Sequence, residues 1–205
     1  MKILTPVTLL LLVFQFSLIA QETPAPTPAT ERLESYKKHQ ALEDSSLFSH
    51  LPFTNIGPTV CSGRIVDVDV NPSRTTEMYV AYASGGVWYT DNNGTTFTPI
   101  FDKEACMTIG DIAVNWSAGI IWVGTGENNS SRSSYSGVGI YKSMDKGKTW
   151  KNTGLAESHH IGRIILHPVN PNIVHVACLG ALYSNNTNRG VYSTSDGGVT
   201  WRQSL

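Results

Sequence analysis

The chain has 205 residues, and its 15 Lys and Arg nearly balance its 16 Asp and Glu, which leaves a formal net charge of −1. This balance argues against a nucleic-acid partner, because binding to phosphates through bulk charge needs a basic excess. The 18 Gly and 10 Pro favour a turn-rich β protein over a helical bundle. We therefore expect an all-β domain behind a short leader.

Residues 1–20 have the pattern of a secretory signal peptide. Lys2 provides a positive end, and an apolar stretch follows from Val7 to Ala20. The pattern predicts cleavage near Ala20–Gln21, and a protein that is secreted, periplasmic or at the cell surface. A membrane anchor is the alternative, but the apolar stretch is shorter than the roughly 20 residues that a span needs. We expect no membrane span after cleavage.

Residues 21–50 differ from the rest of the chain in composition. Gln21–Thr30 is rich in Pro, Thr and Ala, which predicts an extended tether. Glu31–Asp44 is highly charged and predicts a short helix. From Leu51 onward, short apolar runs are broken by Gly, Asn, Pro and Ser, which is typical of strands and turns.

The three cysteines, Cys61, Cys106 and Cys178, do not have the spacing of a metal site. We expect them to be small buried hydrophobic side chains. A Cys61–Cys106 disulfide is the alternative in an oxidising compartment. The sequence predicts no metal and no cofactor.

An internal repeat organises residues 51–205. Four landmarks recur three times in the same order: a Gly-x-Ile step at Gly63, Gly110 and Gly162; a β-rich run at 78–81, 121–124 and 174–177; a Gly before an aromatic strand at Gly86, Gly139 and Gly190; and a closing aromatic at Phe97, Trp150 and Trp201. Units of about 50 residues with four short strands are the size of a propeller blade. We therefore predict a β-propeller of four-stranded blades, with three blades near 59–101, 106–153 and 158–205.

The closing landmark is a turn motif, Ser/Thr-x-Asp-x-Gly-x-Thr-Trp. Its Asp and hydroxyl oxygens can accept hydrogen bonds from backbone N–H groups of the turn, and its Gly permits positive φ. We therefore assign these residues a structural role rather than a catalytic one: Ser143, Asp145, Gly147 and Trp150 in the second unit, Thr194, Asp196, Gly198 and Trp201 in the third, and Asn92, Gly94 and Phe97 in a degenerate first copy.

This motif resembles the Asp box of bacterial-neuraminidase-type repeats. The wider pattern, including Ser84–Trp88 and Val123–Glu127, is similar to the N-terminal part of exported sortilin-like propeller proteins, which are often labelled glycosyl hydrolases. The resemblance covers about Leu51 to Leu205. It implies an exported module that binds protein, peptide or glycan. The alternative that it implies is the N-terminal part of a glycoside hydrolase of the xyloglucanase or sialidase type.

Two departures from the enzyme patterns leave the catalytic residues unknown. Xyloglucanase-type enzymes with this paired-Gly strand have a catalytic Asp two residues before the glycines, where this chain has Ala83. The Arg-Ile-Pro signature of sialidases is also missing, because Val66 and Ile165 follow the two Arg-Ile steps. Glycoside hydrolysis usually needs two carboxyl groups close together, for which Asp111, Glu127 and Glu157 are the candidates.

Propeller geometry places the Asp-box turns on one face and any ligand site on the opposite face. The loops expected on the opposite face are 102–108, 125–138, 154–161 and 179–189, and loops as long as 125–138 are often functional. Arg suits the capture of carboxylates, and aromatic and amide side chains suit sugars or peptides. The candidate binding residues are Arg64, Asp111, Glu127, Arg132, Tyr135, Glu157, His159, His160, Arg163 and Arg189.

Each candidate also has a simpler interpretation. Arg64, Asp111 and Arg163 can instead form ion pairs between blades. His159 and His160 can be a general base, metal ligands or ordinary loop residues.

Propellers typically need four to eight blades to close. We therefore expect these residues to be the front portion of a longer propeller, whose downstream blades are partners of the three seen here.

Overall fold

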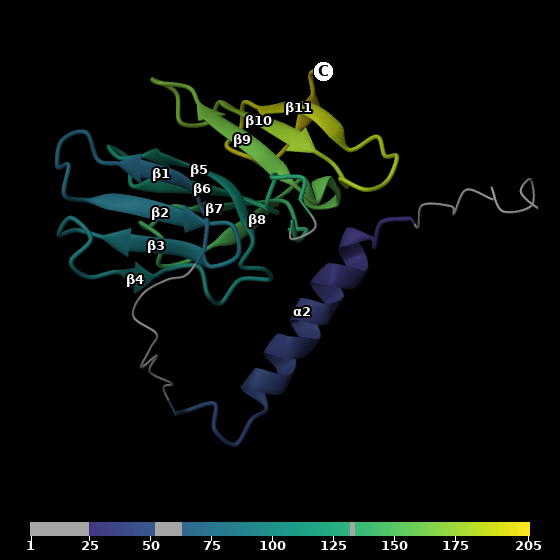
Figure 1. The fold of residues 1–205 in the computed structure, drawn as a ribbon, viewed down its shortest axis with the longest axis horizontal. Helices are drawn as coiled ribbons and strands as arrows, with labels where there is room; N and C mark the ends of the chain where they lie inside the picture. Colours follow the sequence, from purple (N-terminus) through teal and green to yellow (C-terminus); the bar gives the residue numbers. More distant parts are fainter. Residues whose placement is uncertain (1–24, 52–62, 132–133) are drawn as a thin grey trace, which may run out of the picture.

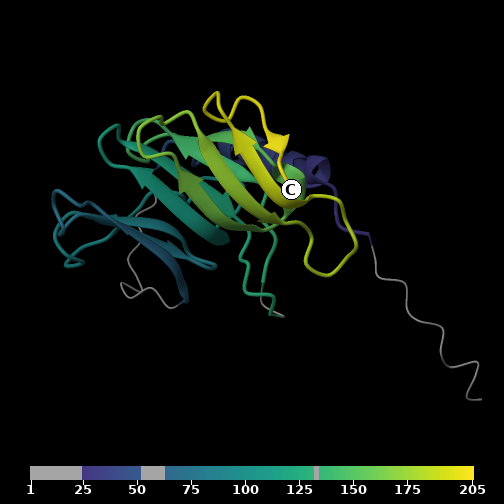
Figure 2. The ribbon, with the colours of Figure 1, turned by 90° about the horizontal axis from the view of Figure 1, so that it is seen from above.

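The computed structural model describes residues 25–51, 63–131 and 134–205. Within them, twelve strands form three antiparallel sheets of four strands each (Figure 1). In each sheet the hydrogen-bonded neighbours follow the order of the chain. Each sheet is therefore a four-stranded meander, and we call them blades 1, 2 and 3. Seen from above, the three sheets lie beside one another in chain order (Figure 2).

The strands have the following bounds. Blade 1 contains β1 (Ile65–Val70), β2 (Met78–Tyr82), β3 (Gly86–Thr90) and β4 (Thr98–Pro99). Blade 2 contains β5 (Ile109–Asn115), β6 (Ile120–Thr125), β7 (Ile140–Ser143) and β8 (Lys151–Gly154). A 3-10 turn, η1 (Ala156–Ser158), leads into blade 3, which contains β9 (Ile161–Leu166), β10 (Val174–Leu179), β11 (Arg189–Thr194) and β12 (Arg202–Gln203).

The core lies in the two interfaces between blades. One apolar cluster fills the interface between blades 1 and 2, with Tyr79, Val87, Phe101, Ile112 and Val123 among its buried members. A second cluster fills the interface between blades 2 and 3, with Trp122, Ile140, Ile161, Ile164 and Val176 among its buried members. Blade 2 is consequently covered on both sides, so β6 is buried along its whole length and β5 along its first five residues.

The first strands of the blades lie side by side, with β5 between β1 and β9. Carboxylates of one blade cap the edge of the next. In β1, Asp67 accepts a hydrogen bond from the N–H of Ile112 at 3.3 Å and Asp69 accepts one from the N–H of Val114 at 2.9 Å. In β5, Asp111 accepts one from the N–H of Ile164 at 2.6 Å. These contacts satisfy edge groups that would otherwise lack partners.

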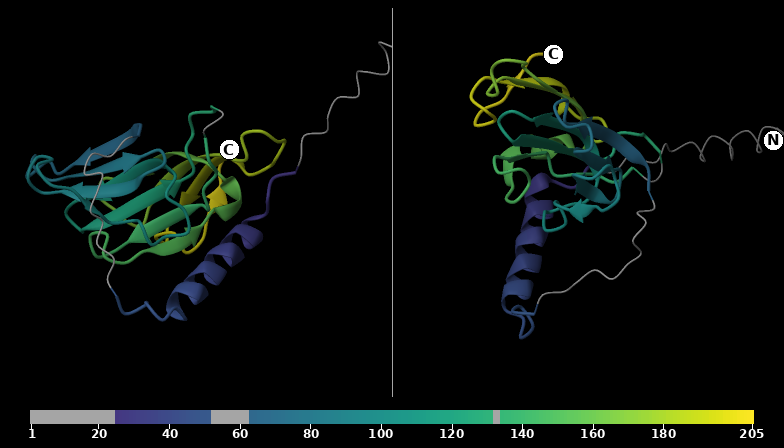
Figure 3. Two further views of the ribbon diagram at one scale, coloured as in Figure 1. Left: turned by 60° about the horizontal axis from the view of Figure 1, so that its bottom comes forward. Right: turned by 90° about the vertical axis from the view of Figure 1, so that its left-hand side faces the viewer.

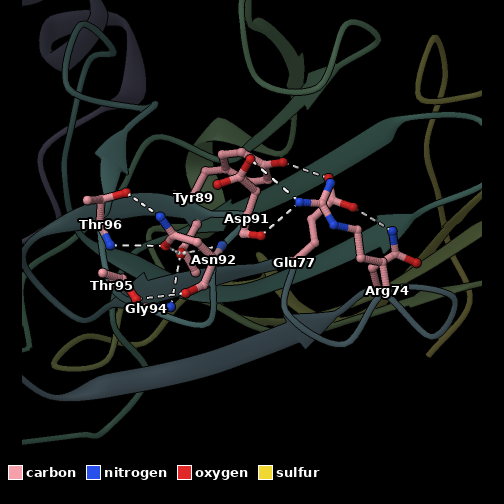
Figure 4. A network of polar contacts seen from close by, with 10 residues as sticks. Arg74, Glu77, Tyr89, Asp91, Asn92, Gly94, Thr95 and Thr96 are labelled. Atoms are coloured by element: carbon pink, nitrogen blue, oxygen red, sulfur yellow. Dashed lines mark hydrogen bonds and ion pairs between the residues drawn. The ribbon is translucent and has the colours of Figure 1, made fainter.

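The turns that carry the repeated motif, or its degenerate copy, join the third and fourth strands of each blade; we name them Asp-box turns after the motif that they resemble. In blade 2, Asp145 accepts hydrogen bonds from the N–H of Thr149 at 2.9 Å and from the hydroxyl of Ser143 at 2.8 Å. The degenerate copy in blade 1 has the same pattern, because the Asn92 amide oxygen accepts a bond from the N–H of Thr96 at 3.0 Å (Figure 4). These turns therefore have a local structural role.

The closing aromatics connect each blade to the one before it. Trp150 donates its indole N–H to the backbone oxygen of Ile100 at 2.7 Å, and Trp201 donates to Thr153 at 2.8 Å. The rings also pack edge to face, Trp150 against Phe101 and Trp201 against Trp122. The turn of the motif therefore makes contacts within its own blade, and the aromatic ring makes contacts with the preceding blade.

Among the described residues, no element covers the outer faces of blades 1 and 3. In β1, Ile65, Val68 and Val70 are 55%, 42% and 40% exposed, and in β9 Ile165 is 58% exposed. On the opposite faces of these strands, Val66 is partly buried and Ile164 is buried in the interfaces described above. Apolar side chains on both open faces are typical of surfaces that another layer covers.

Helix α2 (Ala29–Asp44) lies apart from the sheets and touches them near its N-terminus (Figures 1 and 3). It begins two residues before the charged segment that predicted a helix. Its residues are polar all round, so no apolar stripe fixes it along a sheet. No helix within the described residues is long and apolar enough to cross a membrane. The predicted signal peptide lies outside the described residues.

Candidate binding face

The turns and loops of the blades separate onto two faces. In blade 1, Arg74 of the β1–β2 turn donates a hydrogen bond to the backbone oxygen of Asp91 in the Asp-box turn at 2.9 Å, so these two turns share a face (Figure 4). On the other face lie the loops β4–β5, β6–β7, β8–β9 and β10–β11, which we call the loop face. Backbone bonds tie these loops together: Gly126 donates to Thr108 at 2.8 Å, and Leu179 to His160 at 2.9 Å.

Two arginines from different blades are held by buried carboxylates of blade 2. Arg64, just before β1, pairs with Glu127 of the β6–β7 loop. Arg163 in β9 pairs with Asp111 in β5 at 3.1 Å. The Arg64 and Arg163 side chains remain 51% and 64% exposed, whereas the Glu127 and Asp111 side chains are only 1% and 3% exposed. Both predicted roles are therefore compatible: the arginines pair between blades and still present guanidinium N–H groups to solvent.

On this face, the carboxyl group whose pKa is shifted furthest from its ordinary value is that of Asp111. Its pKa is raised to about 7, chiefly by burial and also by the neighbouring Asp67 carboxyl, while the N–H of Ile164 and the Arg163 guanidinium act in the opposite direction. Sequence reasoning missed Asp67; its only signal was the alternation of Asp and Val in β1.

The two histidines are part of the loop structure rather than of an open site. His159 and His160 are 7% and 3% exposed. The His160 Nδ1 hydrogen-bonds the backbone oxygen of Glu127 at 2.7 Å, so it fixes the start of the β6–β7 loop. Burial lowers the pKa of both imidazoles, and the charge of Arg32 lowers both further. Both rings are therefore favoured in the neutral form.

Glu157 of η1 contacts helix α2. Both of its carboxylate oxygens accept hydrogen bonds from the N–H of Ala29, at 3.0 and 3.2 Å. Arg32 of α2 donates to the backbone oxygens of Gly137 and of Ala156, the latter at 2.8 Å. Sequence reasoning also missed Arg32, because the polar segment around it gives no sign that it contacts residues more than a hundred positions away.

The remaining candidates are not gathered into one cluster. Tyr135 is 62% exposed. Arg189 lies at the start of β11, where its Nε donates to the backbone oxygen of Leu179 at 2.8 Å. Arg132 lies outside the described residues. Ala83, at the position of the xyloglucanase Asp, is 2% exposed.

The thiols of Cys106 and Cys178 are free, and burial raises the pKa of both. The alternative of a Cys61–Cys106 disulfide involves a residue outside the described ones. Across the part of the chain that the structure describes, no three His, Cys, Asp or Glu residues are grouped as metal ligands.

The fold is similar to that of two solved glycoside hydrolases. An ancestral GH74 enzyme matches with a TM-score of 0.55 and 20% identity, over 72% of this chain and 19% of that one. The GH74 xyloglucanase from Xanthomonas campestris matches with a TM-score of 0.50 and 16% identity, over 69% of this chain and 20% of that one. This chain thus spans about a fifth of the length of either protein.

No protein-family model matches the sequence, and no curated protein matches it. Both solved structures are β-propeller proteins. The three four-stranded sheets, packed through their faces in chain order, are therefore blades of an incomplete β-propeller. This result confirms the predicted fold class. At these identities the similarity establishes the fold alone.

Proposed function

We propose that this chain is part of an exported, sortilin-like propeller module that binds protein, peptide or glycan through its loop face. The observation that carries the proposal is the pair of half-exposed arginines, Arg64 and Arg163, each held by a buried carboxylate. A fixed guanidinium loses little conformational freedom when it forms further hydrogen bonds, so it is suited to ligand recognition. The loop face also offers the exposed aromatic side chains of Tyr135 and Tyr183.

Arrays of peptides and glycans would test this binding. The mature chain is compared with an Arg64→Ala/Arg163→Ala variant, and an Arg74→Ala variant serves as the control. Arg74 is equally exposed and ion-paired, with Asp91, but it lies on the Asp-box face. We expect ligands that lose affinity in the double variant and keep it in the control. Ligands that bind all three proteins equally, or no ligand at all, would contradict the proposal.

The alternative is a glycoside hydrolase of the type seen in the GH74 structures, and one observation favours it. Asp111, with the Asp67 carboxyl beside it, has a raised pKa, as a general acid would need. Against it, Ala83 replaces the expected Asp, and Glu127 and Glu157 are occupied by Arg64 and by helix α2. We therefore expect no hydrolysis of xyloglucan or sialosides. Turnover that disappears in Asp111→Asn would establish the alternative.

Export and further blades complete the proposal. The apolar stretch at Val7–Ala20 supports a signal peptide, so the mature protein should begin near Gln21, which mass spectrometry of the exported protein would test. The exposed apolar residues of β1 and β9 support further blades on both open faces. Without them, the chain should associate through those faces, and sedimentation that shows a stable monomer would contradict this.

A further inference from the structure

The geometry points to a second recognition site on the loop face: a groove that binds a helical peptide segment through an arginine, and that the chain's own helix α2 occupies. This inference deepens the proposed binding function by naming the class of ligand. We call the site the acceptor groove. It is formed by the backbone oxygens of Gly137 and Ala156 and the carboxylate of Glu157, all of which are hydrogen-bond acceptors.

The acceptor groove is built by the blades themselves. Gly137 donates its N–H to the backbone oxygen of His159 at 2.6 Å, which ties the β6–β7 and β8–β9 loops together. Asn152 of β8 donates to the backbone oxygen of Val138 at 2.8 Å. At Gly137 a side chain would overlap the backbone of Thr125 and Gly126, so the two ends of the β6–β7 loop meet closely here, and at Gly126 a side chain would overlap the backbone oxygen of His159 in the β8–β9 loop. The groove is therefore fixed by backbone packing and does not depend on α2.

The chemistry of the groove selects the start of a helix that carries an arginine. The first N–H groups of a helix have no partners within the helix, and here Glu157 accepts the one from Ala29. The carboxylate also lies at the positive end of the helix dipole. One turn later, the Arg32 guanidinium spans the oxygens of Gly137 and Ala156. A planar group with several N–H donors suits two separated acceptors better than a lysine does.

The attachment of α2 is confined to its first half, which ends at Tyr36, whose hydroxyl donates a hydrogen bond to the backbone oxygen of Lys103. Ala29, Arg32, Leu33 and Tyr36 are the helix residues that are not fully exposed, and the segment from Lys37 to Asp44 is exposed throughout. Leu33 adds apolar contact at the edge of the core of blades 1 and 2. A helix held by so few contacts opens locally at low cost compared with unfolding of the blades. The groove can therefore exchange its own helix for a similar segment of another molecule.

A labelled peptide with the sequence of residues 25–44 tests this exchange by fluorescence anisotropy. In the full-length Arg32→Ala chain we expect α2 to detach, and the peptide to bind at least about tenfold more tightly than to the wild-type chain, whose own helix competes. The same peptide with its arginine replaced by alanine should bind at least about tenfold more weakly. A lysine peptide should fall between the two. Arg74→Ala is the control chain and should behave as wild type.

Hydrogen exchange and circular dichroism provide a second measurement of whether α2 detaches in the Arg32 variants. In Arg32→Ala, amide protection should fall in residues 29–36 and remain unchanged in the strands. Arg32→Gln gives a second, milder variant that should show the same pattern. Unchanged protection of α2, or equal binding of the arginine and alanine peptides, would overturn the inference. If the peptide does not bind while array ligands still lose affinity in the Arg64→Ala/Arg163→Ala variant, the inference of a peptide site at the acceptor groove is wrong. The proposed binding function of the loop face would then still stand.

Discussion

The three Asp-box turns have the same local structure, but their closing aromatics lie in different surroundings. Trp150 and Trp201 each pack on the preceding blade and donate a hydrogen bond to it. Phe97, in the first blade, is 40% exposed and has no N–H to donate. The turn of blade 1 is nevertheless formed, with Asn92 and Thr90 bonded as Asp145 and Ser143 are. The comparison shows that the turn forms within one blade, and we expect the aromatic residue to add most stability where a preceding blade covers it.

The largest expected effect is the loss of stability when the aromatic ring that packs on a preceding blade is removed. Trp150→Ala should lower the free energy of unfolding by about 3 kcal/mol, because it removes packing against the buried Phe101 ring and a partly buried hydrogen bond. Phe97→Ala should cost about 1 kcal/mol, since its ring is already partly exposed. Urea unfolding of both variants measures the difference. Equal losses would contradict the comparison.

Gly63 and Gly110 occupy equivalent positions at the first strands of blades 1 and 2, and they extend the comparison of surroundings to those strands. A side chain at Gly110 would overlap the backbone oxygens of Ile161 and Gly126, while at Gly63 the one contact among the described residues would be with Tyr82, at an ordinary 3.6 Å. Gly110→Ala should therefore destabilise by about 2 kcal/mol or more. Gly63→Ala should stay within about 0.5 kcal/mol of wild type. Thermal unfolding of the pair is the measurement, and a tolerated Gly110→Ala would mean that the blades are packed less closely.

The interface between blades 2 and 3 should also respond to pH. The pKa of Asp111 is raised to about 7 in the folded protein, against about 4 in the unfolded chain. Between these values the folded state keeps a proton that the unfolded state has lost, so stability falls as pH rises from about 4 to about 7. The variant Asp111→Asn should lack this slope. Parallel pH profiles of wild type and variant would contradict the assignment.

The smallest expected effect is on the pH dependence of stability, through the turn residue Asp145. Hydrogen bonds from Thr149 and Ser143 lower the pKa of Asp145 to about 2. A carboxylate with a lowered pKa stabilises the fold above its unfolded pKa and loses this contribution as pH falls. From about pH 4 to about pH 2, wild type should therefore lose more stability than Asp145→Asn. In blade 1 the equivalent Asn92 cannot titrate, so Asn92→Ala should shift the melting temperature by a similar amount at both pH values.

Much of the fold could be predicted from the sequence, because each blade is specified locally. The four landmarks recur in the turns and strands of all three sheets, and Gly110 lies where the close packing of two blades requires it. The predicted β-propeller class is confirmed. Contacts between distant segments were not predictable in the same way.

Glu157 illustrates that limit. As a loop carboxylate it was a candidate for an open site, but it caps helix α2, whose Ala29 is 128 positions away in the sequence. The segment Ala29–Asp44 has no apolar stripe to reveal a docking surface. The neighbourhood of Asp67 and Asp111 likewise depends on how two blades meet, and not on spacing within either blade.

The carboxylates at the inner strands give the blades a direction. Asp67 and Asp69 of β1 cap N–H groups of β5, and Asp111 of β5 caps one of β9. Strand β5 thus finds acceptors on blade 1, which is synthesised before it, and offers an acceptor to blade 3, which is synthesised after it. We therefore expect the blades to form one after another during synthesis, each serving as the template for the next.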